Sequence, residues 1–133
     1  MKYKFYQYVN ASNAIKKMMG MDFDFKDSYN LYRLAKQFDS VVQFGAERER
    51  ELLEKYNGTI TNDGYINFTH GEGDESKRAG DENKAAFQKA LAELNDTLID
   101  EDITPVCLSI ETMTGKPISP NDIMAIDGFV LFK

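Results

Sequence analysis

The chain has 133 residues, 22 acidic and 16 basic, and a formal net charge of -6 at pH 7. This length suits one domain with its own core, so we expect residues 1–133 to fold as a single domain. The excess of acids repels phosphate backbones, which argues against broad nucleic-acid binding and favours a basic partner surface. No apolar run approaches the roughly 20 residues that cross a bilayer, so no membrane span is expected.

Cysteine usage bears on the compartment. Cys107 is the only cysteine, which excludes an internal disulfide framework, and neither end shows the basic-then-apolar run of a secretory signal. A cytoplasmic setting therefore fits best. No activating basic cluster lies near Cys107 in sequence, so its thiol is expected to be passive.

The N-terminal residues predict a strand and a short helix. Residues 2–9 are rich in aromatic side chains, which is typical of a strand. Asn10 or Ser12 can then cap a helix that Gly20 ends.

A cluster of methionine and phenylalanine follows and continues into an extended segment. It can be interpreted as core filling, which we prefer, or as an adaptable apolar binding surface. Its members are Met18, Met19, Met21, Phe23 and Phe25.

Residues 28–56 predict a long helix, because side chains of one stripe recur at alternating steps of four and three. Asp27 or Ser28 can cap its first turn, and Asn57-Gly58 can take the left-handed conformation that ends a helix.

Residues 59–68, TITNDGYINF, predict a β-hairpin. In a three-residue loop with Gly64 at positive φ, Ile60 faces Ile66, and both share an apolar face with Phe68. A two-residue loop would split this apolar set, so the three-residue register is favoured.

Residues 70–82 contain three glycines and almost no apolar side chains, which predicts a mobile acidic loop. The only histidine, His70, lies there among acids. The spacing matches no zinc or calcium pattern, so no metal or other cofactor is expected.

Asp81 can cap a second helix over residues 82–98, whose apolar stripe lets it return antiparallel along the first helix. Gly45, in the first helix, is interpreted as the point where the two pack closely.

The C-terminal third predicts two strands around a short helix. Val106, Leu108 and Ile110 alternate within a strand over residues 103–113, and residues 129–132 form a strand buried on both sides. Ser119-Pro120-Asn121-Asp122 starts the helix between them. The predicted fold class is thus α+β: an antiparallel helix pair packed with a small mixed or antiparallel sheet.

Two sets of residues are candidates for binding. Exposed aromatic and acidic side chains would recognise a protein partner, and the candidates are Tyr6, Tyr8, Asp100, Glu101 and Asp102.

Arg48 and Arg50, within the alternating charges of residues 47–51, could contact a phosphate or carboxylate. The alternative is a solvated helix face with weak ion pairs. No phosphate loop, paired metal motif or nucleophile elbow is present, so no catalytic residue is assigned.

Three segments carry a resemblance that covers about Ser28 to Val130: YNLYRLAKQF…RERELLEKY, FQKALAELNDT and ISPNDIMAIDGFV. Here the chain resembles small, functionally uncharacterised proteins encoded by phages and prophages of Gram-positive bacteria. The resemblance implies an accessory protein that acts in the host cytoplasm or is built into a particle. It transfers no catalytic residues.

Three functions follow as hypotheses. The first is a non-enzymatic phage-type accessory protein that binds a host or phage protein, either to inhibit it or to assist assembly. The second is a self-associating structural subunit of a virion, joined through the methionine and phenylalanine cluster or an open sheet edge. The third is an enzyme or small-ligand binder that uses Arg48, Arg50 and His70.

Overall fold

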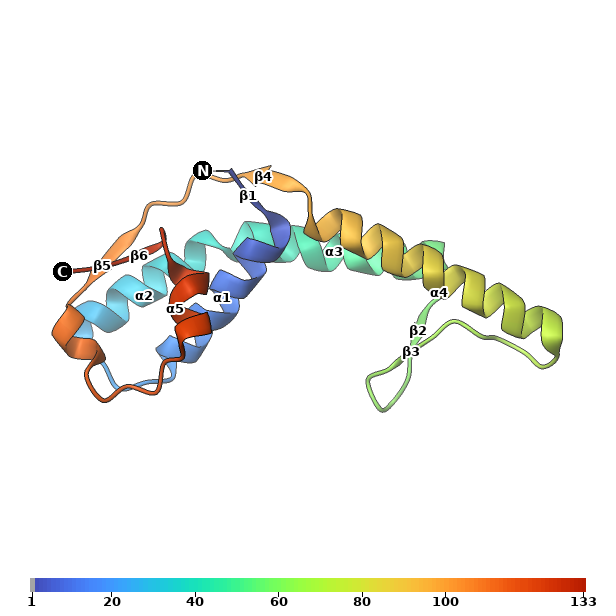
Figure 1. The fold of residues 1–133 in the computed structure, drawn as a ribbon, viewed down its shortest axis with the longest axis horizontal. Helices are drawn as coiled ribbons and strands as arrows, with labels where there is room; N and C mark the ends of the chain where they lie inside the picture. The colour runs from blue at the N-terminus through green and yellow to red at the C-terminus, as the bar shows by residue number, and fades with distance from the viewer. Residues whose placement is uncertain (1) are drawn as a thin grey trace. The chain divides into compact units, whose positions relative to one another are not determined.

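The computed structural model describes residues 2–133, which form five α-helices, one 3-10 helix and three pairs of short strands (Figure 1). This confirms the α+β class. The chain divides into two compact units, of which the first comprises the residues up to Gln43 and from Leu98 onward, and the second comprises Phe44–Thr97. Folding of residues 1–133 as one cooperative domain stays a prediction.

The first unit begins with β1 (Lys2–Lys4) and α1 (Phe5–Met19). The strand predicted over residues 2–9 is therefore wrong beyond Lys4. The aromatic residues favour a strand locally, but a helix buries one continuous side of this segment. Its buried side chains recur at helical spacing and are Phe5, Tyr8, Ala11, Ser12, Ala14, Ile15 and Met18.

The helix predicted over residues 28–56 is two helices, α2 (Phe25–Gln37) and α3 (Asp39–Lys55). They are separated at Phe38, whose side chain is fully buried. The main-chain oxygen of Phe38 accepts a hydrogen bond from the N–H of Val42 at 2.9 Å, within the first turn of α3. The apolar periodicity runs through the break, because Leu31 before it and Val41 after it are buried as Phe38 is.

The N-terminal cap of α2 is Asp24, not Asp27 or Ser28. Asp24 Oδ1 accepts a hydrogen bond from the Asp27 N–H at 2.8 Å. Because the helix starts earlier than predicted, Phe25 lies in its first turn and is 84% exposed. Its assignment to the core is wrong.

Strands and short helices from the C-terminal third complete the first unit. They are β4 (Leu98–Asp100), β5 (Val106–Leu108), η1 (Ile110–Met113), α5 (Pro120–Ile126) and β6 (Val130–Phe132). β1 pairs with β4 in antiparallel fashion, and β5 pairs with β6 in parallel. The strand predicted over residues 103–113 is shorter because Ile110 enters η1, and β6 is not buried throughout because Leu131 is exposed.

Three aromatic rings hold the core of the first unit together. Tyr8 of α1, Phe38 at the end of α2 and Phe129 before β6 are all fully buried. The ring centroids of Phe38 and Phe129 are 5.1 Å apart with an interplanar angle of 70°, and Tyr8 lies 6.1 Å from each of them. These edge-to-face and tilted arrangements are the ones that aromatic pairs prefer.

The second unit contains the C-terminal part of α3, β2 (Thr59–Ile60), β3 (Ile66–Asn67) and α4 (Asp74–Asn95). Within this unit, α3 and α4 run side by side in opposite directions, as the helix pair predicted from the sequence does (Figure 1). Their core is a cluster of buried and half-buried side chains, Leu52, Leu53, Tyr56, Phe68, Phe87, Ala90 and Leu91.

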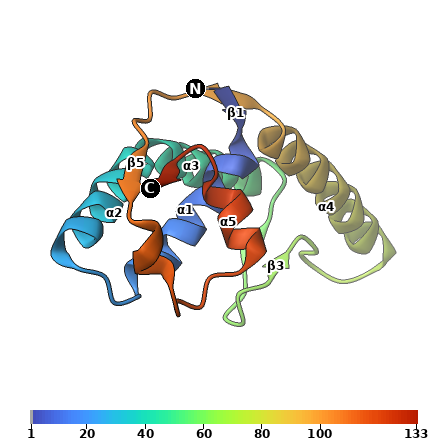
Figure 2. The same ribbon diagram turned by 60° about the vertical axis from the view of Figure 1, so that its left-hand side comes forward.

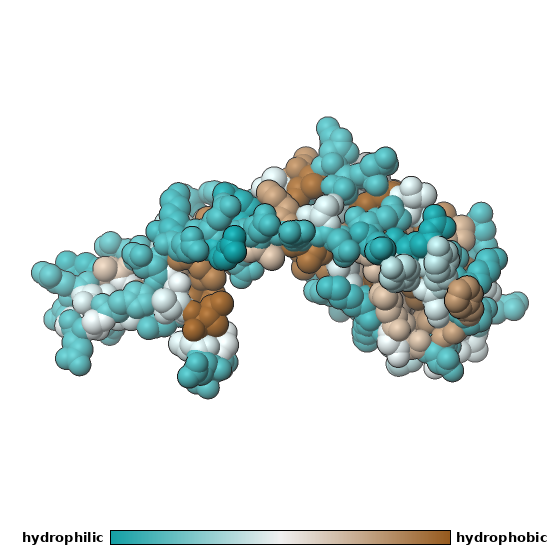
Figure 3. Space-filling model, turned by 180° about the vertical axis from the view of Figure 1, so that it is seen from behind, coloured by the Kyte–Doolittle hydropathy of each residue, from teal (hydrophilic) through white to brown (hydrophobic). Residues whose placement is uncertain are grey.

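The hairpin has the predicted register. Ile60 pairs with Ile66, and Gly64 has a φ of 84°. The apolar face, however, is only partly covered, because Phe68 is buried while Ile60 is 67% exposed. Figure 3 shows the result as a brown apolar patch on the hairpin.

The loop predicted over residues 70–82 ends sooner, because α4 begins at Asp74, before the expected cap Asp81. α4 also stops at Asn95, short of residue 98. A β-carbon on Gly80 would lie 2.9 Å from the Cα of Thr69. Gly80 therefore lets α4 pack directly on the main chain that follows the hairpin.

Gly45 is buried within α3. Its role as the close-packing point of the helix pair stays a prediction.

We expect Gly80→Ala to destabilise the protein, by roughly 2 kcal/mol in free energy of unfolding. Overpacking against main-chain atoms costs roughly 3 kcal/mol, and the gain in helix propensity returns about 1 kcal/mol. Urea unfolding followed by circular dichroism measures the change. Gly20→Ala is the matched control, since its φ is -81° and a β-carbon there would lie 3.5 Å from the nearest atom. Equal stability of both variants would contradict the prediction.

Candidate functional site

Tyr8 does not belong to an exposed partner surface. Its side chain is fully buried, and its hydroxyl donates a hydrogen bond to the main-chain oxygen of Ile99 at 2.8 Å. Burial raises the pKa of Tyr8 above its ordinary value of 10.0. The aromatic residue expected to recognise a partner is instead part of the core and ties α1 to β4.

The other predicted partner residues lie in separate places. Tyr6 is partly exposed and lines a groove that is described below. Asp100 and Asp102 are exposed, and Glu101 accepts a hydrogen bond from the Ser40 hydroxyl at 3.3 Å. These three acids do not line the groove.

Neither the candidate anion-binding residues Arg48 and Arg50 nor His70 lines the groove described below. Arg48 forms an ion pair with Glu51 at 2.7 Å, and both side chains are about half exposed. Arg50 is exposed. The Nε2 atom of His70 is 2.5 Å from the main-chain oxygen of Asn57, which is in the turn after α3. None of these residues lines the groove, so the shared site proposed for Arg48, Arg50 and His70 is not formed there.

The groove lies in the first unit between α1 and α5, which pack side by side (Figure 2). Its volume is about 680 Å³. The capped helix predicted after Ser119 forms one wall. Ser119 and Asp122 make the reciprocal hydrogen bonds of a capping box, with Pro120 in the first turn. The other wall is a stripe of α1 at helical spacing, Tyr6, Gln7, Asn10, Asn13, Ala14 and Lys17.

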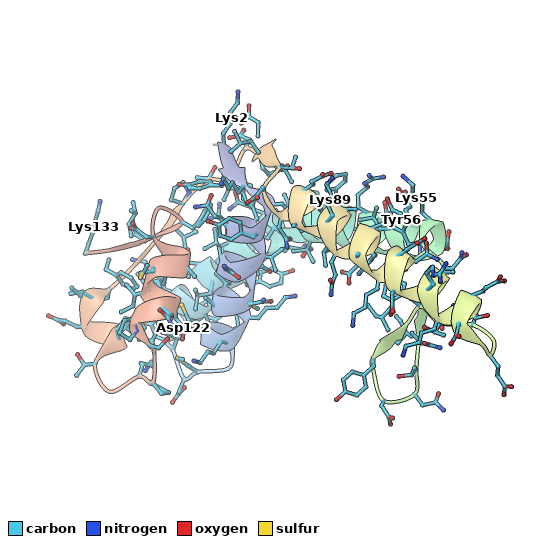
Figure 4. The ribbon with its side chains drawn as sticks, turned by 45° about the vertical axis from the view of Figure 1, so that its right-hand side comes forward. Lys2, Lys55, Tyr56, Lys89, Asp122 and Lys133 are labelled. Atoms are coloured by element: carbon cyan, nitrogen blue, oxygen red, sulfur yellow. The ribbon has the colours of Figure 1, made fainter. Side chains whose placement is uncertain are left out.

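An ion pair joins the two walls at one end of the groove. Lys17 Nζ is 2.8 Å from Asp122 Oδ2, at the place where α5 faces α1 (Figure 4). The hydrogen bond from Lys17, followed by the one from the Ser119 N–H, lowers the pKa of Asp122 below its ordinary value of 3.8. Asp122 therefore stays ionised at neutral pH, and the pair links the C-terminal end of α1 to the first turn of α5.

Three asparagine carboxamides line the groove beside apolar and aromatic side chains such as Ala14, Met124 and Phe129. Asn10 and Asn13 project from α1, and Asn121 projects from α5. All three side chains are exposed. Each carboxamide carries one acceptor oxygen and two donor hydrogens, so the walls present donors and acceptors together.

A second surface is formed by aromatic side chains on the outer side of α2. We call Phe25, Tyr29 and Tyr32 the aromatic face. They follow one another at steps of four and three, opposite the buried Leu31 and Leu34. The rings of Phe25 and Tyr29 are stacked, with centroids 6.1 Å apart and an interplanar angle of 11°.

The aromatic face continues toward the C-terminal end of α2 and has basic neighbours. The rings of Tyr29 and Tyr32 have centroids 6.4 Å apart. The Arg33 guanidinium lies 6.0 Å from the centroid of the Tyr29 ring, and Lys36 Nζ lies 5.3 Å from that of Tyr32. These are cation–π distances.

Sequence reasoning missed both surfaces. The stripe of α1 is divided in the sequence prediction, because residues 2–9 are assigned to a strand and only the residues after them to a helix. The aromatic face did have a signal, since Phe25, Tyr29 and Tyr32 repeat at helical spacing. That repeat crosses the predicted start of the helix at residue 28, because Phe25 is assigned to the methionine and phenylalanine cluster before it.

No family model matches the chain, and no curated protein or solved structure matches it either. Every helix within residues 2–133 is too short or too polar to cross a bilayer. In the same part of the chain, no three histidine, cysteine or acidic side chains gather in a way that could hold a metal ion.

We expect Tyr8→Phe to lower the free energy of unfolding by about 1 kcal/mol at neutral pH, because the half-buried Ile99 carbonyl loses its donor. The raised pKa of Tyr8 means that the unfolded chain ionises first. In the native sequence, the stability that the un-ionised, buried Tyr8 contributes is present below pH 10. It is lost as the pH rises through the folded-state pKa.

Chemical denaturation between pH 7 and 11.5 measures both effects. The Tyr8→Phe variant should lack the loss of stability at alkaline pH that ionisation of Tyr8 causes. Tyr65→Phe changes a side chain that is 74% exposed and serves as the control. If Tyr8→Phe and Tyr65→Phe changed the free energy of unfolding in the same way across this pH range, the burial of Tyr8 would be contradicted.

Proposed function

We propose that this chain is a non-enzymatic protein-binding module, of the accessory kind that its resemblance to phage-encoded proteins implies. The aromatic face of α2 carries the proposal. Its side chains are 84% exposed at Phe25, 51% at Tyr29 and 46% at Tyr32. A helix that already buries one side in a core has no need of a second apolar side for folding, so this side is available to a partner.

The aromatic face has the composition of a binding hot spot. Large aromatic residues dominate the energetics of protein interfaces, and truncation of one such residue commonly costs 2 kcal/mol or more. The three rings contact one another along the helix before any partner arrives. Their side chains therefore lose less conformational freedom on binding than isolated ones do.

The charges beside the aromatic face further define the chemistry of the partner. The exposed side of α2 carries Lys26, Arg33 and Lys36, whereas its acid Asp27 is buried. This surface is locally basic on a chain with a net charge of -6. The matching partner is a protein with an apolar groove bordered by acids, which receives α2 through anchors at positions i, i+4 and i+7.

A photo-crosslinking experiment tests this. A photoreactive phenylalanine analogue replaces Tyr29, and the protein is exposed to a lysate of a Gram-positive host at physiological salt. We expect a discrete protein adduct. The same substitution at Tyr65, an exposed aromatic residue of the second unit, is the matched control and should not give that adduct.

The captured partner is then purified and its affinity measured. Phe25→Ala and Tyr32→Ala should each weaken binding roughly 30-fold, since about 2 kcal/mol per anchor corresponds to that factor. Lys36→Glu should slow association and reduce its dependence on salt. Unchanged affinity in both alanine variants, or capture of single-stranded nucleic acid in place of a protein, would overturn the proposal.

Self-assembly is the second candidate, and the hairpin favours it. Ile60, Tyr65 and Ile66 are exposed, and a two-stranded sheet has unpaired edges on both sides. A structural subunit should then form a concentration-independent oligomer in size-exclusion chromatography with light scattering. A monomer that stays monomeric at high concentration supports the partner-binding function.

A further inference from the structure

We propose that the groove between α1 and α5 is a second binding site, which holds an extended peptide segment with a basic side chain. The groove and the aromatic face use different side chains, so either binding proposal can be disproved while the other stands.

The asparagine side chains of the groove are matched to a peptide main chain. A carboxamide donates and accepts in one plane, as a peptide group does, so it can pair with the N–H and C=O of an extended chain. Asn10 and Asn13 offer this from α1, and Asn121 offers it from the facing helix. Asn10 and Asn13 are exposed although they adjoin the buried Ala11 and Ala14.

The length of the groove also fits a peptide. From Tyr6 to Lys17 the stripe on α1 rises roughly 16 Å at the helical rise of 1.5 Å per residue. An extended chain advances about 3.3 Å per residue, so the stripe accommodates about five residues. The Lys17–Asp122 ion pair marks one end of the stripe.

The opposite end selects a cation. Tyr3, Tyr6 and Asp127 line it, which combines aromatic rings with an exposed carboxylate. The Tyr3 hydroxyl is held against the main chain at Gly128, where a β-carbon would lie 2.8 Å from it. Rings beside a carboxylate favour a lysine or arginine side chain.

The test uses a fluorescein-labelled heptapeptide of alternating serine and valine with one central arginine. Fluorescence anisotropy measures its affinity, and nuclear magnetic resonance locates it through the amide signals of α1 and α5. Asn10→Ala combined with Asn13→Ala should weaken binding roughly 10-fold. Asn83→Ala on α4 is the matched control and should leave the affinity unchanged.

Two altered peptides separate the parts of the proposal. N-methylation of alternate peptide bonds removes main-chain donors and should abolish binding. Replacement of the arginine by glutamate should weaken binding roughly 10-fold or more. In the Asp127→Asn variant, the affinities for the arginine peptide and the glutamate peptide should differ less.

Four results would overturn the inference: no binding by the arginine peptide, equal affinity for the N-methylated peptide, equal competition by free arginine, or amide shifts confined to α2.

The Asn13→Trp variant distinguishes loss of binding from loss of fold, because the new side chain fills the groove from an exposed position. It should block the peptide while the circular dichroism spectrum is unchanged. Phe25→Ala should not affect this binding, so failure here is distinguishable from failure of the proposed function.

Discussion

Contact among three buried rings is the constraint on which the first unit depends. Tyr8, Phe38 and Phe129 come from distant parts of the sequence, and each is fully buried. Because the Tyr8 hydroxyl also donates to the Ile99 carbonyl, α1, α2 and the C-terminal third are fixed at one place. Removing one ring would leave a cavity lined by the other two, with a cost of about 3 to 5 kcal/mol.

This aromatic contact determines which side of each helix faces outward. Burial of Phe38 with Leu31 and Leu34 turns Phe25, Tyr29 and Tyr32 toward solvent. Burial of Tyr8 likewise turns Asn10 and Asn13 of α1 toward α5, where they line the groove. The aromatic face and the groove are both consequences of a core built on the opposite sides of the same helices.

Local signals predicted several elements well. The hairpin register followed from Gly64 and the pairing of Ile60 with Ile66, because turn geometry involves only neighbouring residues. The capped helix at Ser119 and the left-handed Asn57 after α3 were predicted for the same reason. Residues 2–9 were assigned wrongly because strand propensity is easily overridden by burial.

By itself the sequence determined the α+β class, the turns and the helix that begins after Ser119, since all of these depend on short-range chemistry. It did not determine that α2 ends at Phe38, that Tyr8 is internal, or that Asn13 and Asn121 share a groove. Those outcomes require contacts between residues far apart in the chain, whose free energies appear only when the core forms. The candidate binding surfaces were therefore decided by the tertiary structure.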